Sequence, residues 1–362
     1  MSVDNGLWSG YKGELDSIVK DRLDASIAHE EGDRVPIWDY IDNRATFDHF
    51  AQEGDTYAET MVRVYHGLGI DLCRGYGASF EETDDGKSSD DGDWKISGQT
   101  QWVTHYTINS VEELAAYEPE EITDEGIEKW LENIHGGMVD FAPRSMFVPG
   151  SGCGFHETYG LMGQEQFSLA IYDARDDIER IMWTFNARGV ALAKKAAEER
   201  LAPLFFTWAD IAYKDALLFS PNFLRETFIP TLRNVCEPLN NVGIKPIFHS
   251  DGDVSENLDD MIDAGIGGLN PIEPMAGMDI GAVKKRYGDE LILVGNVDCS
   301  QVLPLGSVDD VIEATKQCLR DAAVGGGHFI GSSSEITPST PLPNVLAFFE
   351  TCQTAGRYPI EC

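Results

Sequence analysis

The sequence predicts an α/β protein built as a (β/α)8 barrel, or TIM barrel, with an N-terminal helical extension and a β-hairpin excursion. Apolar strand-like segments alternate with amphipathic helical ones, eight such segments occur, and polar residues follow most of them. The eight predicted strands are 34–40, 70–74, 145–152, 202–212, 245–248, 268–271, 291–298 and 328–336. The alternation favours parallel strands joined by helical crossovers, and the count of eight favours closure into a barrel.

The 362 residues fit a single barrel domain, because α/β barrels reach this length. We expect residues 1–31 to form the extension and residues 32–362 to form the barrel. An open doubly wound sheet is the alternative. A dinucleotide-binding sheet of that kind carries a GxGxxG turn after its first strand, and the segment RVPIWDYIDNR has none.

The composition excludes several classes of partner. The chain has 62 acidic and 27 basic residues, a formal net charge of -35, whereas nucleic acids and anionic membranes require a positive surface. Seven cysteines without a CxxC spacing, and no secretory signal, predict a reduced cytoplasmic protein. No apolar run approaches the roughly 20 residues of a membrane span.

Three segments lie outside the predicted barrel strands. The extension is expected to contain a helix, because apolar residues recur there at helical spacing: Leu15, Ile18, Val19, Leu23 and Ile27. The segment 81–93, EETDDGKSSDDGD, is predicted to be a solvated loop because it is charged and has no apolar residue. The alternating segment 94–108 predicts a β-hairpin that turns near Gly98.

Polar residues follow the predicted strands, and in a barrel all of these positions open on one face. They are Asp39, Asn43, Arg74, Asp210, His249, Asp251, Glu273, Asn296, Asp298, Ser334 and Glu335. The group is rich in acids and poor in Arg and Lys. That composition suits metal binding or proton transfer and suits a polyanionic substrate badly.

The stretch 245–273 is the predicted centre of the site, because it brings His249, Asp251 and Glu273 to the ends of two neighbouring strands. We expect His249, Asp210 and Glu273 to be catalytic. His249, Asp251 and Glu273 are candidate metal ligands. The expected substrate-binding residues are Arg74, Asn43, Asn296, Asp298 and Ser334.

Several of these residues also have structural interpretations. His249 could be a hydrogen-bonded structural histidine. Asp251 could cap the helix that follows it, and Glu273 could be a turn residue between two prolines. Asp298 could cap its own loop. Asp210 has the stronger functional case, because a carboxylate without a role is costly to place after so apolar a strand.

From residue 210 onward the chain resembles the uroporphyrinogen decarboxylase superfamily. The segments that carry the resemblance are DIAYKDALLFSPNFLRETFIPTLRNV, IFHSDGDV, GLNPIEPMAGMDI, YGDELILVGNVD and GGGHFIGSSSEI, and the resemblance extends more weakly over 32–358. It implies a single (β/α)8 barrel. It also implies one of two activities: decarboxylation of an acetate-bearing tetrapyrrole without a cofactor, or methyl transfer to or from a corrinoid.

The sequence departs from both patterns of the superfamily. The decarboxylases carry an arginine-rich RQAGRY-type segment after strand one, and here WDYIDNR offers the single Arg44. Gripping several carboxylates requires bidentate arginines. The thiol-methylating members bind zinc through His-x-Cys and a later Cys; here His249 is kept, Asp251 replaces the first Cys, and Ser333 or Ser334 stands near the second.

The resemblance to the methyltransferase branch gives the leading hypothesis: a corrinoid-dependent demethylase that moves a methyl group from a small methylated O- or N-compound to cobalamin. Cobalamin, carried by a partner protein or used as co-substrate, is the expected cofactor, with zinc or another divalent metal. The expected partners are the small-molecule substrate, a corrinoid-binding protein and a second copy of the chain in a homodimer. A carboxy-lyase of the uroporphyrinogen decarboxylase type and a non-catalytic small-ligand-binding barrel are the alternatives.

Overall fold

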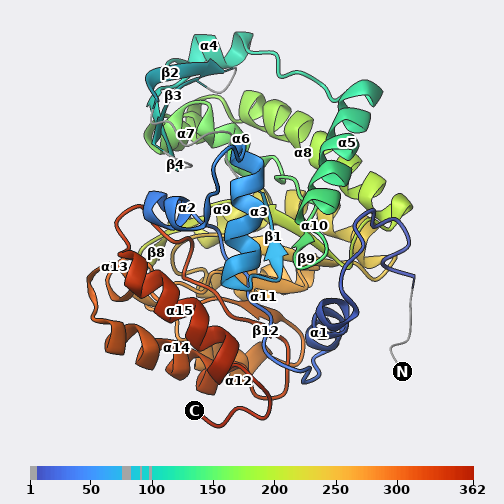
Figure 1. Ribbon diagram of the computed structural model, residues 1–362. Coiled ribbons are helices and arrows are strands. Elements are labelled where there is room, and N and C mark those ends of the chain that lie inside the picture. The colour runs from blue at the N-terminus through green and yellow to red at the C-terminus, as the bar shows by residue number, and fades with distance from the viewer. Residues whose placement is uncertain (1–5, 76–82, 90–91, 98–99) are drawn as a thin grey trace.

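The computed structural model describes residues 6–75, 83–89, 92–97 and 100–362 and has an α/β fold (Figure 1). Its central feature is a parallel five-stranded sheet with the strand order β12-β11-β10-β9-β6. The strands are β6 (Leu204–Trp208), β9 (Lys245–His249), β10 (Gly268–Asn270), β11 (Ile292–Val294) and β12 (His328–Phe329). Each is short and almost wholly buried, as strands covered on both faces are.

Parallel pairing continues beyond both edges of this sheet. Strands β1 (Leu72–Cys73) and β5 (Met146–Phe147) pair with each other, and isolated parallel bridges join Gly150 to Phe206, Trp38 to Leu72, and Ile37 to Ile330. All eight predicted strand segments therefore take part in parallel pairing. Segment 34–40 forms single bridges and not the continuous strand that we expected. Pro36 has no N–H to donate, and the Ile37 N–H donates to the Asp71 carboxylate.

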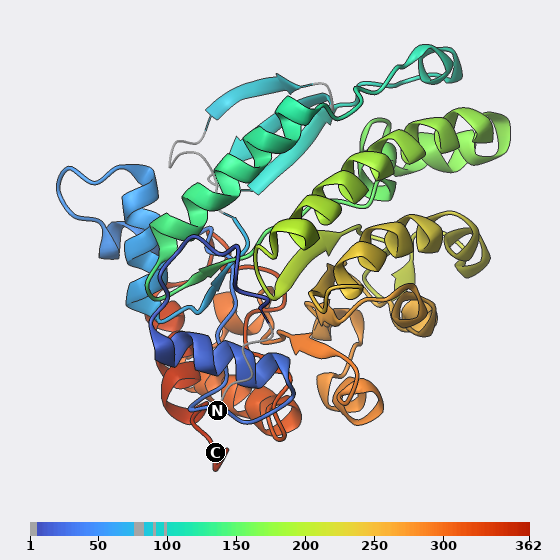
Figure 2. The ribbon, with the colours of Figure 1, turned by 90° about the vertical axis from the view of Figure 1, so that its right-hand side faces the viewer.

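Helices follow the parallel strands along the chain and surround them (Figures 1 and 2). The larger ones are α3 (Tyr57–Leu68), α5 (Asp124–Phe141), α7 (Gly163–Asp173), α8 (Arg175–Glu199), α10 (Phe228–Asn240), α12 (Ile280–Tyr287), α14 (Val308–Ala322) and α15 (Leu342–Ala355). The shorter ones are α2 (Arg44–Phe50), α4 (Val111–Ala116), α6 (Phe155–Gly160), α9 (Pro221–Glu226), α11 (Leu258–Ala264) and α13 (Val302–Leu305). Among the described residues, no helix has the length and apolarity to cross a membrane.

The predicted extension forms helix α1 (Ser17–Ile27), as its apolar spacing indicated. Its Val19 and Leu23 join a buried cluster with side chains from the parallel strands. That cluster draws on almost every strand segment: Trp38, Leu72, Met146, Val148, Leu204, Phe206, Ile247, Ile292, Val294 and Phe329. A larger buried group includes apolar residues of the surrounding helices. The core therefore lies on both faces of the parallel strands.

A three-stranded antiparallel sheet stands at the top of the molecule in both views, far from the C-terminus (Figures 1 and 2). Its strands are β2 (Thr83–Ser89), β3 (Gly92–Ser97) and β4 (Thr100–His105). The predicted hairpin is confirmed, although its expected turn at Gly98 falls outside the described residues. The loop prediction for 81–93 was wrong over 83–89. The backbone of that charged segment pairs with β3, a non-local contact that composition does not reveal. A short hairpin, β7 (Ala212–Tyr213) with β8 (Ala216–Leu217), follows β6.

Candidate functional site

Three predicted site residues meet where β6 and β9 end. Trp208 of β6 lies opposite His249 of β9, and Asp210 follows two residues later. Alternate residues of a strand share a face, so His249 lies on the same face as Ile247, which belongs to the cluster lined by the strands. Asp251 follows His249 by two residues. The local strand pattern thus directs the imidazole and both carboxylates toward one point.

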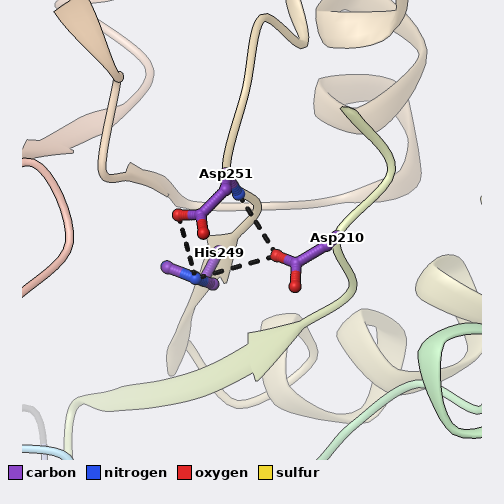
Figure 3. A group of neighbouring side chains, drawn as sticks. All are labelled: Asp210, His249 and Asp251. Carbon is purple, nitrogen blue, oxygen red and sulfur yellow. Dashed lines mark hydrogen bonds and ion pairs between the residues drawn. The ribbon is translucent and has the colours of Figure 1, made fainter. Parts of the chain in front are cut away.

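The three side chains form a compact cluster (Figure 3). His249 Nε2 lies 3.7 Å from Asp251 Oδ1 and 3.9 Å from Asp210 Oδ1. The Asp251 backbone N–H donates to Asp210 Oδ1 at 3.2 Å. One ligand atom from each residue lies within 4.8 Å of the other two. Asp210, His249 and Asp251 therefore surround a volume small enough for one cation.

The hydrogen bond at the other ring nitrogen fixes the orientation of His249. Nδ1 lies 2.7 Å from Asn270 Oδ1, and the Asn270 Nδ2 group donates to the Val294 carbonyl at 3.4 Å. Because an amide oxygen can only accept, Nδ1 carries the proton and neutral His249 has its lone pair on Nε2. That lone pair faces two carboxylates. The arrangement is repulsive until a proton or a metal ion lies between them.

Asp251 carries the sign of an incomplete site. Its Oδ1 is buried and has no hydrogen-bond partner among the described residues, although the side chain as a whole is 47% exposed. Burial raises the pKa of the Asp251 carboxyl, His249 lowers it, and the charge of Asp210 raises it again. Asp251 caps neither of the helical segments that follow, whose N-caps are Val254 and Asn257. The capping interpretation of Asp251 was wrong.

Glu273 lies beside the cluster but outside the group of three. Its Oε2 accepts the Gly252 N–H at 2.8 Å, and burial raises the pKa of its carboxyl. The expected metal-ligand set of His249, Asp251 and Glu273 is therefore not the set brought together. Asp210 takes the place that we expected for Glu273. Both follow strands that flank β9, but Asp210 lies two residues after Trp208, the partner of His249, whereas Glu273 lies three residues after Asn270, the partner of His249 on the other side.

Two further polar residues complete the surroundings of the cluster, and sequence reasoning missed both. Asn270 ends β10 and orients His249. His156, in α6, places Nδ1 3.6 Å from Asp210 Oδ2. Asn270 could have been found because it is the polar residue near the end of the predicted strand 268–271. The signal for His156 was weak: a histidine just after the glycine-rich exit of the third strand segment.

The predicted substrate-binding residues divide by their contacts. Arg74 lies over the rings of Tyr40 and Phe206, at 4.8 and 5.0 Å from their centroids, and pairs with no carboxylate among the described residues. Asn43 is buried and fully engaged: its oxygen caps α2 through Thr46, and its amide donates to two carbonyls. Ser334 is half-buried.

The two candidates after β11 have structural contacts. Asp298 accepts hydrogen bonds from the backbone of Ser300, Gln301 and Val302 at the start of α13, as its capping interpretation predicted. Asn296 is buried, and its amide donates to the Ile272 carbonyl at 2.8 Å. Arg74 and Ser334 thus remain the predicted binding residues with side-chain groups free of such roles among the described residues.

The donor set of the cluster fits a divalent metal ion. Imidazole nitrogen and carboxylate oxygen bind zinc at about 2.0–2.2 Å, so two ligand atoms on one tetrahedral ion lie about 3.4 Å apart. The separations here, 3.7 and 3.9 Å, need only small side-chain shifts. The unpartnered Asp251 Oδ1 and the lone pair on His249 Nε2 are both groups that a cation satisfies. The absence of a thiolate separates this set from a His-x-Cys zinc site.

The profile of the uroporphyrinogen decarboxylase (URO-D) family matches residues 137–355, which hold the whole cluster. The chain belongs to the URO-D family. A uroporphyrinogen decarboxylase of Coxiella burnetii (strain RSA 493 / Nine Mile phase I) is 35% identical over 75 residues. That alignment covers 21% of this chain and only 20% of the decarboxylase.

Among solved structures, a methyltransferase from Methanosarcina mazei is similar over most of the chain, with a TM-score of 0.69 and 21% identity. The likeness covers 92% of this chain and 98% of the methyltransferase. At this identity the likeness establishes a shared fold.

Proposed function

We propose that this URO-D family protein is a corrinoid-dependent methyltransferase that takes a methyl group from a small methylated O- or N-compound. The observation that carries the proposal is the cluster of Asp210, His249 and Asp251, in which the His249 lone pair and an unpartnered carboxylate oxygen converge. A site of this kind activates a heteroatom by binding a metal or a proton. The similarity to the M. mazei methyltransferase supports the choice of branch.

We infer that residues 32–362 close into a (β/α)8 barrel, with 1–31 as its extension. The parallel bridges that link Trp38 to Leu72, Gly150 to Phe206 and Ile37 to Ile330 support closure, since each joins segments at the edges of the regular sheets. In such a barrel the cluster lies at the carboxyl ends of the strands, where barrel enzymes have their active sites.

In this proposal Asp210, His249 and Asp251 hold a divalent metal ion, zinc or another that accepts nitrogen and oxygen ligands. When bound, the ion supplies Lewis acidity that makes the demethylated heteroatom a better leaving group. Asn270 keeps the proton on His249 Nδ1 and thereby keeps Nε2 available. Cobalamin, carried by a separate corrinoid-binding protein or used as co-substrate, would supply the acceptor for the methyl group.

The test is methyl transfer to cob(I)alamin, followed by its absorbance, with a panel of small methyl ethers, methanol and methylamines. The wild-type protein should react with one of them and contain a divalent metal by elemental analysis. His249→Ala should lose the metal and lower the rate by about 10²–10⁴. His49→Ala, which changes an exposed histidine on α2, is the matched control and should retain both. Full activity in His249→Ala would contradict the site assignment.

A carboxy-lyase is the second candidate, favoured by one observation. Arg74 presents a guanidinium with no carboxylate partner among the described residues, so it could hold one carboxylate of a substrate. The 75-residue similarity to uroporphyrinogen decarboxylases points the same way. Release of carbon dioxide from a carboxylated substrate, abolished in Arg74→Ala, with no reaction of any methylated compound, would replace the first proposal. Failure of both reactions would favour a ligand-binding barrel.

A further inference from the structure

His156 lines a cavity of about 670 Å³ whose lining, among the described residues, includes none of the three residues of the cluster. His156, Tyr159 and Gly160 of α6 form one part of its wall, and Tyr106 and Asn109, which follow β4, form another. Because His156 Nδ1 is 3.6 Å from Asp210 Oδ2, this residue contacts both the cavity and a candidate metal ligand.

The hydrogen bonds of His156 determine which of its two ring nitrogens carries the proton. The Asp210 backbone N–H, which can only donate, points at Nδ1 from 3.2 Å. The Tyr159 hydroxyl lies 2.8 Å from the same atom and donates to the Asp210 carbonyl at 2.9 Å. Nδ1 therefore accepts, and the ring proton is on Nε2. This Nε2–H remains as a donor without a described protein partner.

The other described residues that line the cavity indicate an uncharged occupant. They provide the rings of Tyr106 and Tyr159 and the amides of Asn109, Gln164 and Gln166, and they include no Arg or Lys. An anion would meet no counter-charge there. A cation would meet the positive edge of the Nε2–H bond, and the lining has a single acid, Glu165, which is exposed as Gln164 and Gln166 are.

We propose that this cavity binds the body of an uncharged, oxygen-bearing substrate, and that His156 Nε2–H donates a hydrogen bond to an oxygen of that substrate. The proposal rests on the proposed function only in treating the cavity as part of the substrate site. It selects neutral O-compounds over methylammonium compounds, a choice that the proposed function leaves open. His156 thereby becomes a specificity-determining residue beside the candidate metal ligands.

The first experiment fills the cavity without touching the cluster. Gly160 has an ordinary helical backbone, and a side chain added there meets open space. Titrations followed by NMR should show methoxybenzene binding to the wild-type protein and no detectable binding to Gly160→Leu. Gly136→Leu is the matched control, since Gly136 is an exposed glycine of helix α5 with open space above it, and it should bind as the wild type does.

The second experiment isolates the hydrogen bond. His156→Asn keeps an acceptor for the Asp210 N–H, but its amide N–H groups do not reach the position of Nε2, so it should weaken methoxybenzene binding about threefold to tenfold. Ethylbenzene has the same shape without an acceptor, and its affinity should not change. A loss of affinity for both probes would assign His156 a structural role only and overturn the donor assignment.

The charge selectivity is tested with phenyltrimethylammonium, which should bind more weakly than methoxybenzene; tighter binding of the cation overturns the proposal. Binding in these titrations does not depend on cobalamin or on turnover. If methoxybenzene binds and Gly160→Leu prevents it while no methylated compound reacts, the proposed function fails and the cavity assignment stands. If wild-type protein transfers methyl groups but Gly160→Leu does so equally well, the cavity assignment fails alone.

Discussion

Two groups of acidic side chains lie at opposite ends of the parallel strands, and they differ in whether basic side chains pair with them. Asp71 and Asp33, before the start of β1, are paired with Arg22 and Arg34. The carboxylates of the candidate site, after the ends of β6 and β9, have no Arg or Lys within ion-pair distance among the described residues. The chain thus neutralises one acidic group with its own cations and leaves the other open.

The paired group is a closed network. The Asp71 carboxylate accepts hydrogen bonds from Nη1 of Arg22 at 2.6 Å, Nη1 of Arg34 at 2.7 Å and the Ile37 N–H at 2.7 Å. Its side chain is 2% exposed. Burial alone would raise the pKa of the Asp33 carboxyl, but Arg22 outweighs it and holds that pKa below its usual value. Every charge has a partner. The network joins α1 to the first strand segments and serves stability.

The open group has the opposite properties, which are those of a site. Burial and mutual repulsion raise the pKa of Asp251, and an oxygen of its carboxylate has no described partner. Carboxylates in this state are costly, and proteins keep such strain mainly where a ligand relieves it. The comparison therefore assigns stability to the amino ends of the strands and function to the carboxyl ends, the division common in α/β barrels.

The largest expected effect is on the paired group. Asp71→Ala leaves two buried guanidinium groups without their common partner, and breaking a buried pair costs about 3–5 kcal/mol. The free energy of unfolding, measured by denaturant titration, should fall by this amount. Metal content of the folded fraction should not change, because the cluster lies at the other end of the strands.

The control for this variant is Asp48→Ala, which removes a surface pair between Asp48 and Arg44, both more than half exposed. Solvent screens that pair, so stability should change little. If Asp71→Ala were as mild as Asp48→Ala, the network would not be the stabilising element that the comparison requires.

Local signals allowed the sequence to predict much of the fold. Helix α1 lies at Ser17–Ile27, within the extension in which apolar residues recur at helical spacing. Strand β2 was missed because its charged residues gave no alternation and its strand character depends on pairing with β3. Propensity does not encode such non-local partners.

The candidate site was predictable only in part for the same reason. His249 and Asp251 are two residues apart on one strand exit, so their proximity is local. Asp210 and Glu273 follow the two strands that flank β9, so the choice between them depends on the path of the chain after each strand, and the approach of His156 depends on where α6 lies relative to Asp210. Sequence patterns locate strand ends, but they do not state which side chains meet above them.

The next expected effect is pH-dependent and concerns Asp39, an acid buried at the end of segment 34–40. Burial raises its pKa from 3.8 to about 7, against hydrogen bonds from Ser332 that favour ionisation. A raised carboxyl pKa means that the folded state holds the proton more tightly than the unfolded state. This contribution to stability is fully present below pH 3.8 and is lost as the pH rises through about 7.

Asp39→Asn should therefore flatten the fall in unfolding free energy between pH 4 and pH 7, whatever its effect on the absolute value. Denaturant titrations of both proteins across this range measure the slope. An unchanged slope would mean that Asp39 is ionised throughout this range and would contradict the prediction.

The smallest expected effect is a gain in stability, and it tests the comparison most directly. In the metal-free protein, Asp251→Asn removes one of two neighbouring unpaired negative charges, so the free energy of unfolding should rise by about 1 kcal/mol or less, since solvent screens the half-exposed side chain. The same variant should bind zinc more weakly, because an amide oxygen is a poorer ligand than a carboxylate. Denaturant titration with chelator and zinc titration measure the two effects. A loss of metal-free stability would show that Asp251 is a structural acid like Asp71, and the distinction between the two ends of the strands would not hold.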